Sequence, residues 1–295
     1  MKSILVIGGS GLVGSSLIKL ASDDMKVFFT FCNSPTEIPN VKSFHIDLLD
    51  EKKSSISDLI KSLSPDVVVN TAALQSVDYC ELNNQVADRL HVESTKEISD
   101  ACADSSSKLI HFSSNFVFDG KKGSYKEDDL CNPISYYGKT RLEAEKIVLD
   151  SSSNNVILRT TVIYGWHKNS KFTNFVLERL KNGTKIEAYT DQYGNPTLAD
   201  DLAKCIIKII SEDTTGLFHA VGNTCVNRYE FALAIANTFG FDENLIVPVT
   251  SDQKPQTALR PQNGCLDTSK IKNEIGFEFC DITTGISHLH GKSLN

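Results

Sequence analysis

The chain has 295 residues, of which 40% are hydrophobic and 23% are charged, a composition typical of a folded globular protein. The net charge of −7 argues against a nucleic-acid-binding protein, because such proteins usually carry a basic stripe. No apolar run is long enough to span a bilayer, and the short apolar run at the N-terminus breaks at glycines without a signal-peptide cleavage site. We therefore expect neither a membrane segment nor a secretion signal.

Short apolar strands and amphipathic helices alternate through the first 165 residues. Residues 4–7 form an unbroken apolar run, as expected of a parallel strand that is buried on both faces. Further strands are expected at residues 26–31, 43–46, 66–70, 108–113 and 155–159, and helices at residues 15–21, 56–63, 84–103 and 137–149. This alternation predicts an α/β fold with a doubly wound parallel sheet, in which ligands bind beyond the carboxyl ends of the strands.

The regular alternation loosens beyond residue 165. Helices are expected at residues 174–180, 198–210 and 229–239, a strand at 216–221, a turn-rich loop at 191–196 and a loop-like stretch at 247–267. We interpret residues 1–165 plus about 191–222 as one domain built on the sheet. Residues of about 166–190 plus 223–295 would form a smaller C-terminal lid domain that binds the substrate.

The cysteines give no sign of a disulfide framework or a metal site. All eight are scattered along the chain, and no two form a CxxC pair. A chain of this size does not need disulfides to stabilise its core, and metal-ligand spacing is absent. Reduced thiols, no bound metal and a cytoplasmic location are therefore expected.

A glycine-rich turn follows the first strand and opens the first helix. In this context Gly8 permits the tight turn, Gly11 lets the backbone approach a pyrophosphate, and Gly14 lets the helix pack closely on the strand. The N–H groups and the dipole of the helix then attract the phosphates. The sequence predicts a Rossmann-type dinucleotide site whose first contacts are Gly8, Ser10, Gly11, Leu12, Val13 and Gly14.

The end of the second strand indicates which dinucleotide binds. NAD-binding proteins usually place an acid there to hold the ribose 2′-hydroxyl. Here the strand is followed by Asn33 and Ser34, and the first acid after the strand is Glu37. NADP(H) is therefore favoured and NAD(H) is less favoured, although no arginine is present to clamp the 2′-phosphate. After the third strand, Asp47 and Leu48 are expected to contact the adenine. A helix N-cap is the alternative interpretation of Asp47.

The segment Tyr137-Gly138-Lys139-Thr140-Arg141 opens a helix after a proline. Residues four apart share a helix face, so Tyr137 and Arg141 point the same way and Lys139 points elsewhere. A phenol with an ordinary pKa near 10 is a poor acid–base catalyst at neutral pH unless a nearby cation stabilises its anion. Arg141 carries such a charge.

Seven segments together resemble the extended short-chain dehydrogenase/reductases. Within them the chain is similar to the dTDP-4-dehydrorhamnose reductase group and to its relative, the regulatory β subunit of methionine adenosyltransferase. The matching segments are GGSGLVG (8–14), NTAAL (70–74), FSSNFVFDG (112–120), YGKTRLEAE (137–145), RTTVIYG (159–165), DQYGNPT (191–197) and RPQNGCLDTSK (260–270). They span nearly the whole chain in the family's order.

The resemblance implies hydride transfer from a nicotinamide to a ketone carbon of a sugar nucleotide. It makes Tyr137 the proton donor, Ser114 its hydroxyl partner, and Arg141 the occupant of the position that a lysine usually holds beside the nicotinamide ribose. It adds Ala72 and Ala73 to the expected cofactor contacts. The expected substrate contacts are Ser114, Asn115, Phe116, Val162, Arg260 and Asn263, although Arg260 and Asn263 could equally tie the lid to the main domain.

Four residues depart from the family pattern. Arg141 replaces the lysine, His91 replaces an asparagine, Val162 replaces a tryptophan, and Phe116 replaces a tyrosine. Read alone, His91 is a packed core histidine and Ser114 a structural residue at a strand end. The departures affect the catalytic and substrate assignments but leave the cofactor site intact.

The sequence therefore leaves two candidate functions. The first is NADPH-dependent reduction of a 4-keto-deoxy-sugar nucleotide. The alternative is a catalytically weak or inactive NADP-binding regulatory subunit. The first requires a sugar-nucleotide substrate and permits a homodimer, whereas the second requires a partner enzyme. An epimerase or dehydratase is less favoured, because the segments after residue 159 resemble reductases.

Overall fold

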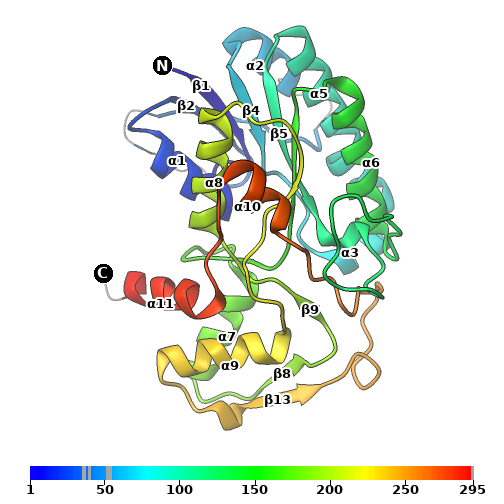
Figure 1. Cartoon of the computed structure of the whole chain (residues 1–295), viewed down its shortest axis with the longest axis vertical. Coiled ribbons are helices and arrows are strands. Elements are labelled where there is room, and N and C mark those ends of the chain that lie inside the picture. Colours follow the sequence, from blue (N-terminus) through cyan, green and yellow to red (C-terminus); the bar gives the residue numbers. More distant parts are fainter. Residues whose placement is uncertain (35–37, 39–40, 51–54, 294–295) are drawn as a thin grey trace.

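The computed structural model describes residues 1–34, 38, 41–50 and 55–293. Its centre is a sheet of seven parallel strands in the order β11-β6-β5-β4-β1-β2-β3 (Figure 1). The strands are β1 (Ser3–Ile7), β2 (Lys26–Phe31), β3 (Lys42–His45), β4 (Val67–Asn70), β5 (Lys108–Ser114), β6 (Val156–Thr160) and β11 (Gly216–His219). The strand order reverses between β1 and β4, which is where such sheets bind ligands. The predicted doubly wound parallel sheet is confirmed.

Strand β1 lies in the middle of the sheet and is buried on both faces. Ile4 and Val6 belong to the apolar cluster on one face, and Leu5 and Ile7 to the cluster on the other. Each of the four side chains is at most 1% exposed. Because successive side chains of a strand point to opposite faces, only an unbroken apolar run fits this position.

Helices cover both faces of the sheet (Figure 1). One face is covered by α1 (Leu12–Ala21), α8 (Ala199–Ser211) and α10 (Ser269–Ile275). The other face is covered by α2 (Ile56–Leu63), α5 (Ser94–Asp104) and α6 (Tyr136–Ser151). The strand and helix expected to return to the sheet after residue 191 are β11 and α8, so that prediction is confirmed.

The long helix expected at residues 84–103 is interrupted. It consists of α4 (Asn84–Asp88), a π-helical turn η1 (Arg89–Glu93) and α5, and the short helix α3 (Val77–Leu82) precedes it. A π-helical turn is wider than an α-helical one and is often found at functional sites. Here the wide turn carries His91, whose side chain is 1% exposed.

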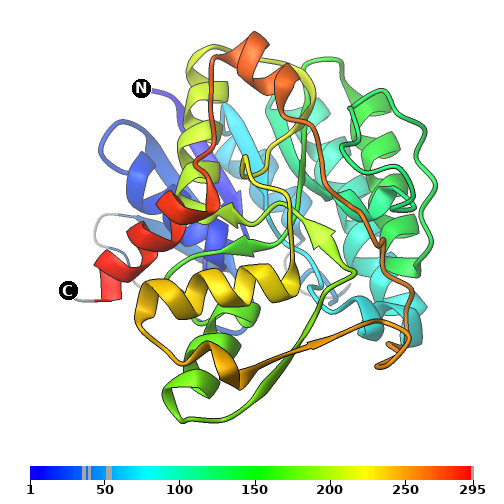
Figure 2. The ribbon, with the colours of Figure 1, turned by 60° about the horizontal axis from the view of Figure 1, so that its bottom comes forward.

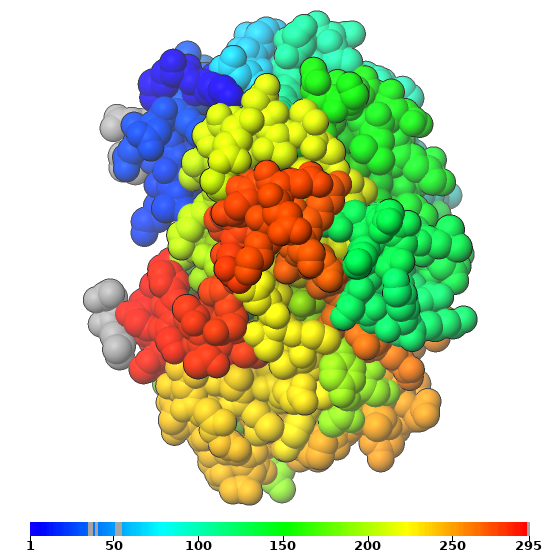
Figure 3. Space-filling model, in the orientation of Figure 1, coloured from blue at the N-terminus to red at the C-terminus, as the bar shows by residue number. Residues whose placement is uncertain are grey.

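A further apolar cluster forms the lower part of the molecule in Figure 1 and faces the reader in Figure 2. Its elements are α7 (Lys171–Lys181), β8 (Ile186–Tyr189), α9 (Arg228–Phe239), β13 (Ile246–Val249) and α11 (Ile282–Ser293). Strands β8 and β13 pair in parallel, so the prediction that residues 247–249 belong to a loop was wrong. In Figure 3 the orange and red C-terminal segments lie across the front of the molecule. The division into two domains stays a prediction.

Two short pairs of strands join these parts. They are β7 (Ile163–Tyr164) with β10 (Thr197–Leu198), and β9 (Tyr193–Gly194) with β12 (Val226–Asn227). The loop expected at residues 191–196 therefore contains a strand pairing. Among the described residues, no helix has both the length and the apolar character needed to cross a membrane.

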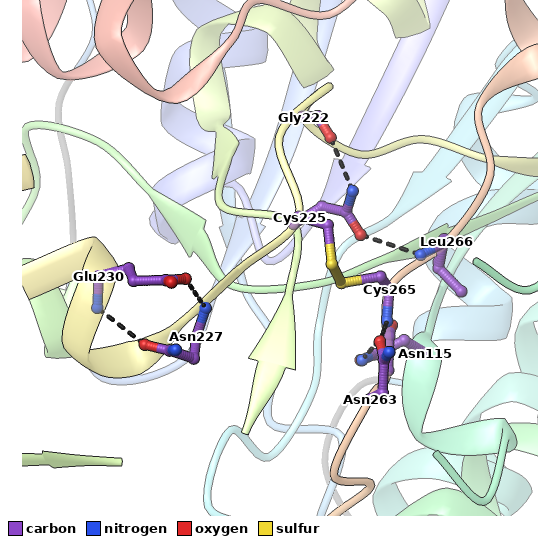
Figure 4. The surroundings of a disulfide bond; sticks show 10 residues. Asn115, Gly222, Cys225, Asn227, Glu230, Asn263, Cys265 and Leu266 are labelled. Carbon is purple, nitrogen blue, oxygen red and sulfur yellow. Dashed lines mark hydrogen bonds between the residues drawn. A yellow bond between two sulfur atoms is a disulfide. The ribbon is translucent and has the colours of Figure 1, made fainter. Parts of the chain in front are cut away.

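A disulfide joins Cys225 to Cys265 (Figure 4). The expectation that all eight cysteines are reduced is therefore wrong for this pair, and the other six are free. The bond connects the approach to β12 with the segment 263–266. The side chain of Asn195 bridges the same two regions: its amide donates to Gly222 O at 3.0 Å, and its oxygen accepts the Leu266 N–H at 2.9 Å. The cytoplasmic location stays a prediction.

Candidate functional site

The glycine turn lies between β1 and α1, as the sequence predicts. Gly8 has a φ of +79°, a left-handed conformation that favours glycine. A Cβ at Gly14 would lie 2.6 Å from Gly8 O and 2.7 Å from Gly9 Cα, so no side chain fits there. Helix α1 begins at Leu12, three residues before the expected start, and its N-cap Gly11 provides no side-chain hydrogen bond. The first N–H groups of α1 are therefore not capped by this residue and suit an anion.

A cavity of about 670 Å³ opens beside this turn. Of the residues predicted to bind the cofactor, its wall includes Gly11, Leu12, Val13, Ala73, Tyr137 and Arg141. Of those predicted to bind the substrate, it includes Ser114, Asn115, Phe116, Val162 and Arg260. The fold thus brings together side chains from the ends of β1, β4, β5 and β6 and from the start of α6.

Tyr137 lies in the first turn of α6 and faces the cavity. Ser135 caps the helix by accepting the Gly138 N–H at 3.2 Å, which fixes where the helix starts. The Tyr137 ring lies edge-on to two others, with centroids 5.5 Å from His91 and 5.4 Å from Phe116. Both neighbours restrict how the phenol can turn.

Arg141 lies one helical turn beyond Tyr137 and is 2% exposed. Its Nη2 atom donates to the carbonyl oxygen of Phe112 in β5. Its Nε and Nη1 atoms are buried and have no hydrogen-bond partner. Burying a guanidinium whose donors have no partner costs free energy of folding. We therefore expect a ligand in the cavity to supply an acceptor for these two atoms.

His91 is the packed histidine that its apolar neighbours indicate, and it also supports the site. Its Nε2 accepts the Leu74 N–H at 3.0 Å, so Nδ1 carries the proton and donates to Thr140 Oγ1 at 2.9 Å. Thr140 in turn donates to the carbonyl of Tyr137. Burial, and to a lesser degree the charge of Arg141, lowers the pKa of His91 to about 2. The imidazole is therefore neutral across the physiological range.

Ser114 lies at the end of β5, where its backbone is extended and the short helix η2 (Asn115–Val117) begins. Its hydroxyl accepts the Phe116 N–H and donates to Asn115 Oδ1, each at 3.3 Å. The Asn115 amide donates to Gly264 O at 3.0 Å. Asn115 thus anchors the segment that carries Cys265 as well as lining the cavity.

The other predicted substrate contacts have different surroundings. Val162 has a φ of +46°, a strained conformation for a β-branched residue and one that often marks a functional site. Arg260 lines the cavity but also forms a bidentate pair with Asp78, at 2.7 and 2.8 Å. Asn263 does not line the cavity, and its N–H donates to Gly120 O at 2.9 Å. Of the two interpretations, Arg260 fits both, whereas Asn263 fits an anchoring role.

Several predicted cofactor contacts lie outside the cavity wall. They are Gly8, Ser10, Gly14, Asn33, Ser34, Asp47, Leu48 and Ala72. Asp47 accepts the Leu49 N–H at 2.9 Å, while the next described helix, α2, is capped by Ser55, so the helix N-cap interpretation is wrong. Leu48 is buried, and the Ala72 N–H donates to Asn70 Oδ1 at 3.1 Å. Glu37 lies outside the described residues.

A family model described as the RmlD substrate binding domain matches residues 1–293. The chain belongs to this family. Among curated relatives, dTDP-4-dehydrorhamnose reductase from Aggregatibacter actinomycetemcomitans is 33% identical, in a match that covers 95% of this chain and 96% of the relative. A solved dTDP-4-dehydrorhamnose reductase from Clostridium acetobutylicum has a TM-score of 0.87 at 26% identity, covering 99% of this chain and 100% of the other.

The chain is also similar to proteins that are named as a subunit of another enzyme. The β subunit of methionine adenosyltransferase 2 from Bos taurus is 29% identical, over 92% of this chain and 82% of the relative. The reductase match is stronger in both identity and coverage, so the regulatory alternative is not favoured. Similarity to reductases over nearly the whole chain confirms the expected oxidoreductase class.

Arg228 was not among the residues predicted for this RmlD-family site. It is the first residue of α9 and lines the cavity, half-buried, with its guanidinium carbon 5.4 Å from the ring centre of Phe172. Burial, followed by repulsion from Arg260, lowers its pKa to about 10. The sequence does hold a signal, because Asn227 and Glu230 have capping-box spacing and form that motif, which places Arg228 at a helix start.

Proposed function

We propose that the protein is an NADPH-dependent reductase of a 4-keto-deoxy-sugar nucleotide. The observation that carries this proposal is the convergence of Tyr137, Ser114 and Arg141 on one cavity beside the glycine turn. A proton donor, a hydroxyl for the substrate oxygen and a buried cation are the groups that carbonyl reduction requires.

The residues present fit a dinucleotide. The close approach of Gly14 to Gly8 O leaves a turn that a phosphate can approach, and the unpaired Nε and Nη1 atoms of Arg141 supply donors for a ribose hydroxyl or a carboxamide. Asn33 and Ser34 after β2 favour NADPH over NADH. When bound, NADPH supplies the hydride.

The side chains of this protein would then bind, orient and protonate the oxygen of the substrate ketone. Ser114 donates a hydrogen bond to the carbonyl oxygen and orients it toward Tyr137. Tyr137 donates its phenolic proton to that oxygen as negative charge develops there, and Arg141 stabilises the resulting phenolate. His91 and Phe116 hold the ring in position, and the neutral state of His91 avoids a second positive charge beside Arg141.

Arg228 and Arg260, which both line the cavity, favour a substrate that contains a diphosphate. No carboxylate in the described part of the chain pairs with Arg228, and Arg260 repels it. A diphosphate would relieve this repulsion and accept hydrogen bonds from Arg228, while Arg260 keeps its pair with Asp78 and adds positive charge nearby. A nucleoside diphosphate linked to a sugar carries such a group between its base and the reacting ring.

The test is reduction of 4-keto sugar nucleotides by the purified protein, followed as loss of NADPH absorbance. We expect Tyr137→Phe to abolish turnover while NADPH affinity changes less than about twofold, since the phenolic oxygen alone is removed. Tyr136→Phe is the matched control, because the hydroxyl of Tyr136 donates to Asp88 at 2.7 Å and is assigned no catalytic role. An absence of turnover with every nucleotide sugar offered would overturn the proposal.

A further inference from the structure

A lysine from a distant part of the chain lies at the end of β2. Lys168 belongs to the loop between β7 and α7, and its Nζ donates to Ser34 Oγ at 2.8 Å, across 134 residues of sequence. No cation is expected at this point from the sequence, because the residues that follow β2 are neutral up to Ser34. The fold supplies one from the segment that was assigned to the substrate-binding domain.

The loop that carries Lys168 is held by its own hydrogen bonds. The side-chain amide of Asn174 donates to the carbonyl oxygens of His167 and Lys168, at 2.9 and 3.2 Å. The Ser170 N–H also donates to the His167 carbonyl, at 3.0 Å, and the Asn169 N–H donates to His167 Nδ1 at 3.1 Å. The backbone from which Lys168 extends is therefore fixed relative to α7.

The ammonium of Lys168 is not neutralised by any of the acidic residues that the structure describes. Within the part of the chain that the structure describes, no carboxylate forms an ion pair with it. The acid predicted for the adenine, Asp47, accepts from the Leu49 N–H and interacts with Cys32, whose pKa is raised first by burial and then by Asp47. An ammonium that contacts a neutral hydroxyl is stabilised further by an added anion, because the opposite charges attract each other and the anion accepts hydrogen bonds from the ammonium.

We propose that Lys168 and Ser34, with Asn33 beside them, form the subsite for the 2′-phosphate of the dinucleotide and so select NADPH over NADH. This inference rests on the proposed function for the identity of the ligand. In Rossmann-type folds the adenosine ribose lies at the end of the second strand, which is where Ser34 and the Lys168 ammonium meet. A phosphate monoester is a compact dianion that suits the point charge of a lysine and the hydroxyl of a serine.

The experiment compares dissociation constants for NADPH and NADH, measured by nicotinamide fluorescence and calorimetry without substrate. We expect Lys168→Met to weaken NADPH binding between about tenfold and hundredfold, the effect of losing one hydrogen bond to a charged group, and to change NADH binding less than twofold. Lys181→Met is the matched control, because it removes an exposed lysine at the other end of α7. Adenosine 2′,5′-bisphosphate and 5′-AMP serve as competitors that report on the 2′-phosphate alone.

The outcomes separate this subsite from the proposed reaction. Equal weakening of NADPH and NADH by Lys168→Met, or a wild-type protein that binds the two dinucleotides alike, overturns the subsite even if the reductase activity is found. A selective loss of NADPH binding in a protein that reduces no nucleotide sugar supports the subsite and overturns the reaction. A wild-type protein that binds neither dinucleotide overturns both.

Discussion

The ring of Tyr137 meets the ring of His91 edge-on, with 5.5 Å between centroids. His91 is itself held at both nitrogens, by Leu74 N–H and Thr140 Oγ1, on a π-helical turn. The proposed proton donor is therefore braced by a residue that does not titrate near neutral pH. This arrangement links the stability of the fold to the geometry of the site.

Buried neutral histidines predict a loss of stability in mild acid. Burial lowers the pKa of His91 to about 2 and that of His219 to about 3, and it also lowers the pKa of His111 well below its usual value. Below about pH 6.5 the unfolded chain binds protons that the native protein does not, so the free energy of unfolding falls as the pH falls. Each histidine contributes up to roughly 1.4 kcal/mol per pH unit.

Urea denaturation at pH 7.0 and pH 5.5 measures this dependence. His219→Gln should flatten the slope, because it removes one of the buried histidines that remain unprotonated in the native protein. A free energy of unfolding that is equal at the two pH values would contradict the prediction.

The buried guanidinium of Arg141 is expected to lower the stability of the ligand-free protein while supporting cofactor binding and turnover. Arg141→Met removes two buried donors that lack partners, so we expect the ligand-free protein to gain about 1–3 kcal/mol in the free energy of unfolding. The same variant should lose turnover and bind NADPH at least tenfold more weakly, because the proposed acceptors on the cofactor lose their donors. Thermal unfolding with and without NADPH measures both effects.

Arg141→Lys is the companion variant. It keeps the charge and, as the residue usual in the family, should retain or raise turnover. If Arg141→Met were less stable without ligand and unchanged in NADPH affinity, the guanidinium would be structural only.

Arg228→Met should reveal the subsite for the diphosphate. Loss of one of two guanidinium groups at the cavity wall should raise the KM for the nucleotide sugar about tenfold or more, with NADPH affinity unchanged. Arg179→Met, which removes an exposed arginine from α7, is the control. Initial-rate kinetics decide the matter, and an unchanged KM would argue against a diphosphate at this wall.

The Cys225–Cys265 disulfide predicts how many thiols of the denatured protein react before and after reduction. Denatured without reductant, the protein should expose six reactive thiols, and all eight after reduction. The bond closes a loop between residues 40 positions apart, so its reduction should lower the free energy of unfolding by about 2–4 kcal/mol. Cys225→Ser should behave like the reduced protein, and eight reactive thiols before reduction would refute the pairing.

The sequence predicted those parts of the fold whose signal is local. The apolar run of β1 and the glycines that follow it indicate their structure within a dozen residues, and both were located correctly. Strand β13 was missed because it is short, contains Pro248 and pairs with β8 some 60 residues earlier in the chain. Nothing in the spacing of Cys225 and Cys265 indicates that they meet.

The site was predicted to the level of helix faces and strand ends. Spacing placed Tyr137 and Arg141 on one face, but the bond from Arg141 to Phe112 depends on how α6 packs against β5. Lys168 could not be connected with Ser34, because that contact depends on where α7 lies relative to β2. Contacts between distant segments are set by tertiary packing, which local patterns do not encode.

The order in which the chain is made matters for how its parts assemble. All seven strands of the sheet have been synthesised once His219 has been added, whereas the apolar cluster around α7 and α9 also needs Ile286 and Leu289 from α11. Because domains fold as their residues emerge from the ribosome, the strands of the sheet can pair during translation. The apolar cluster can be completed only after the last helix has been synthesised. A premature stop before residue 282 would leave a formed sheet carrying a cavity wall without its supporting helix.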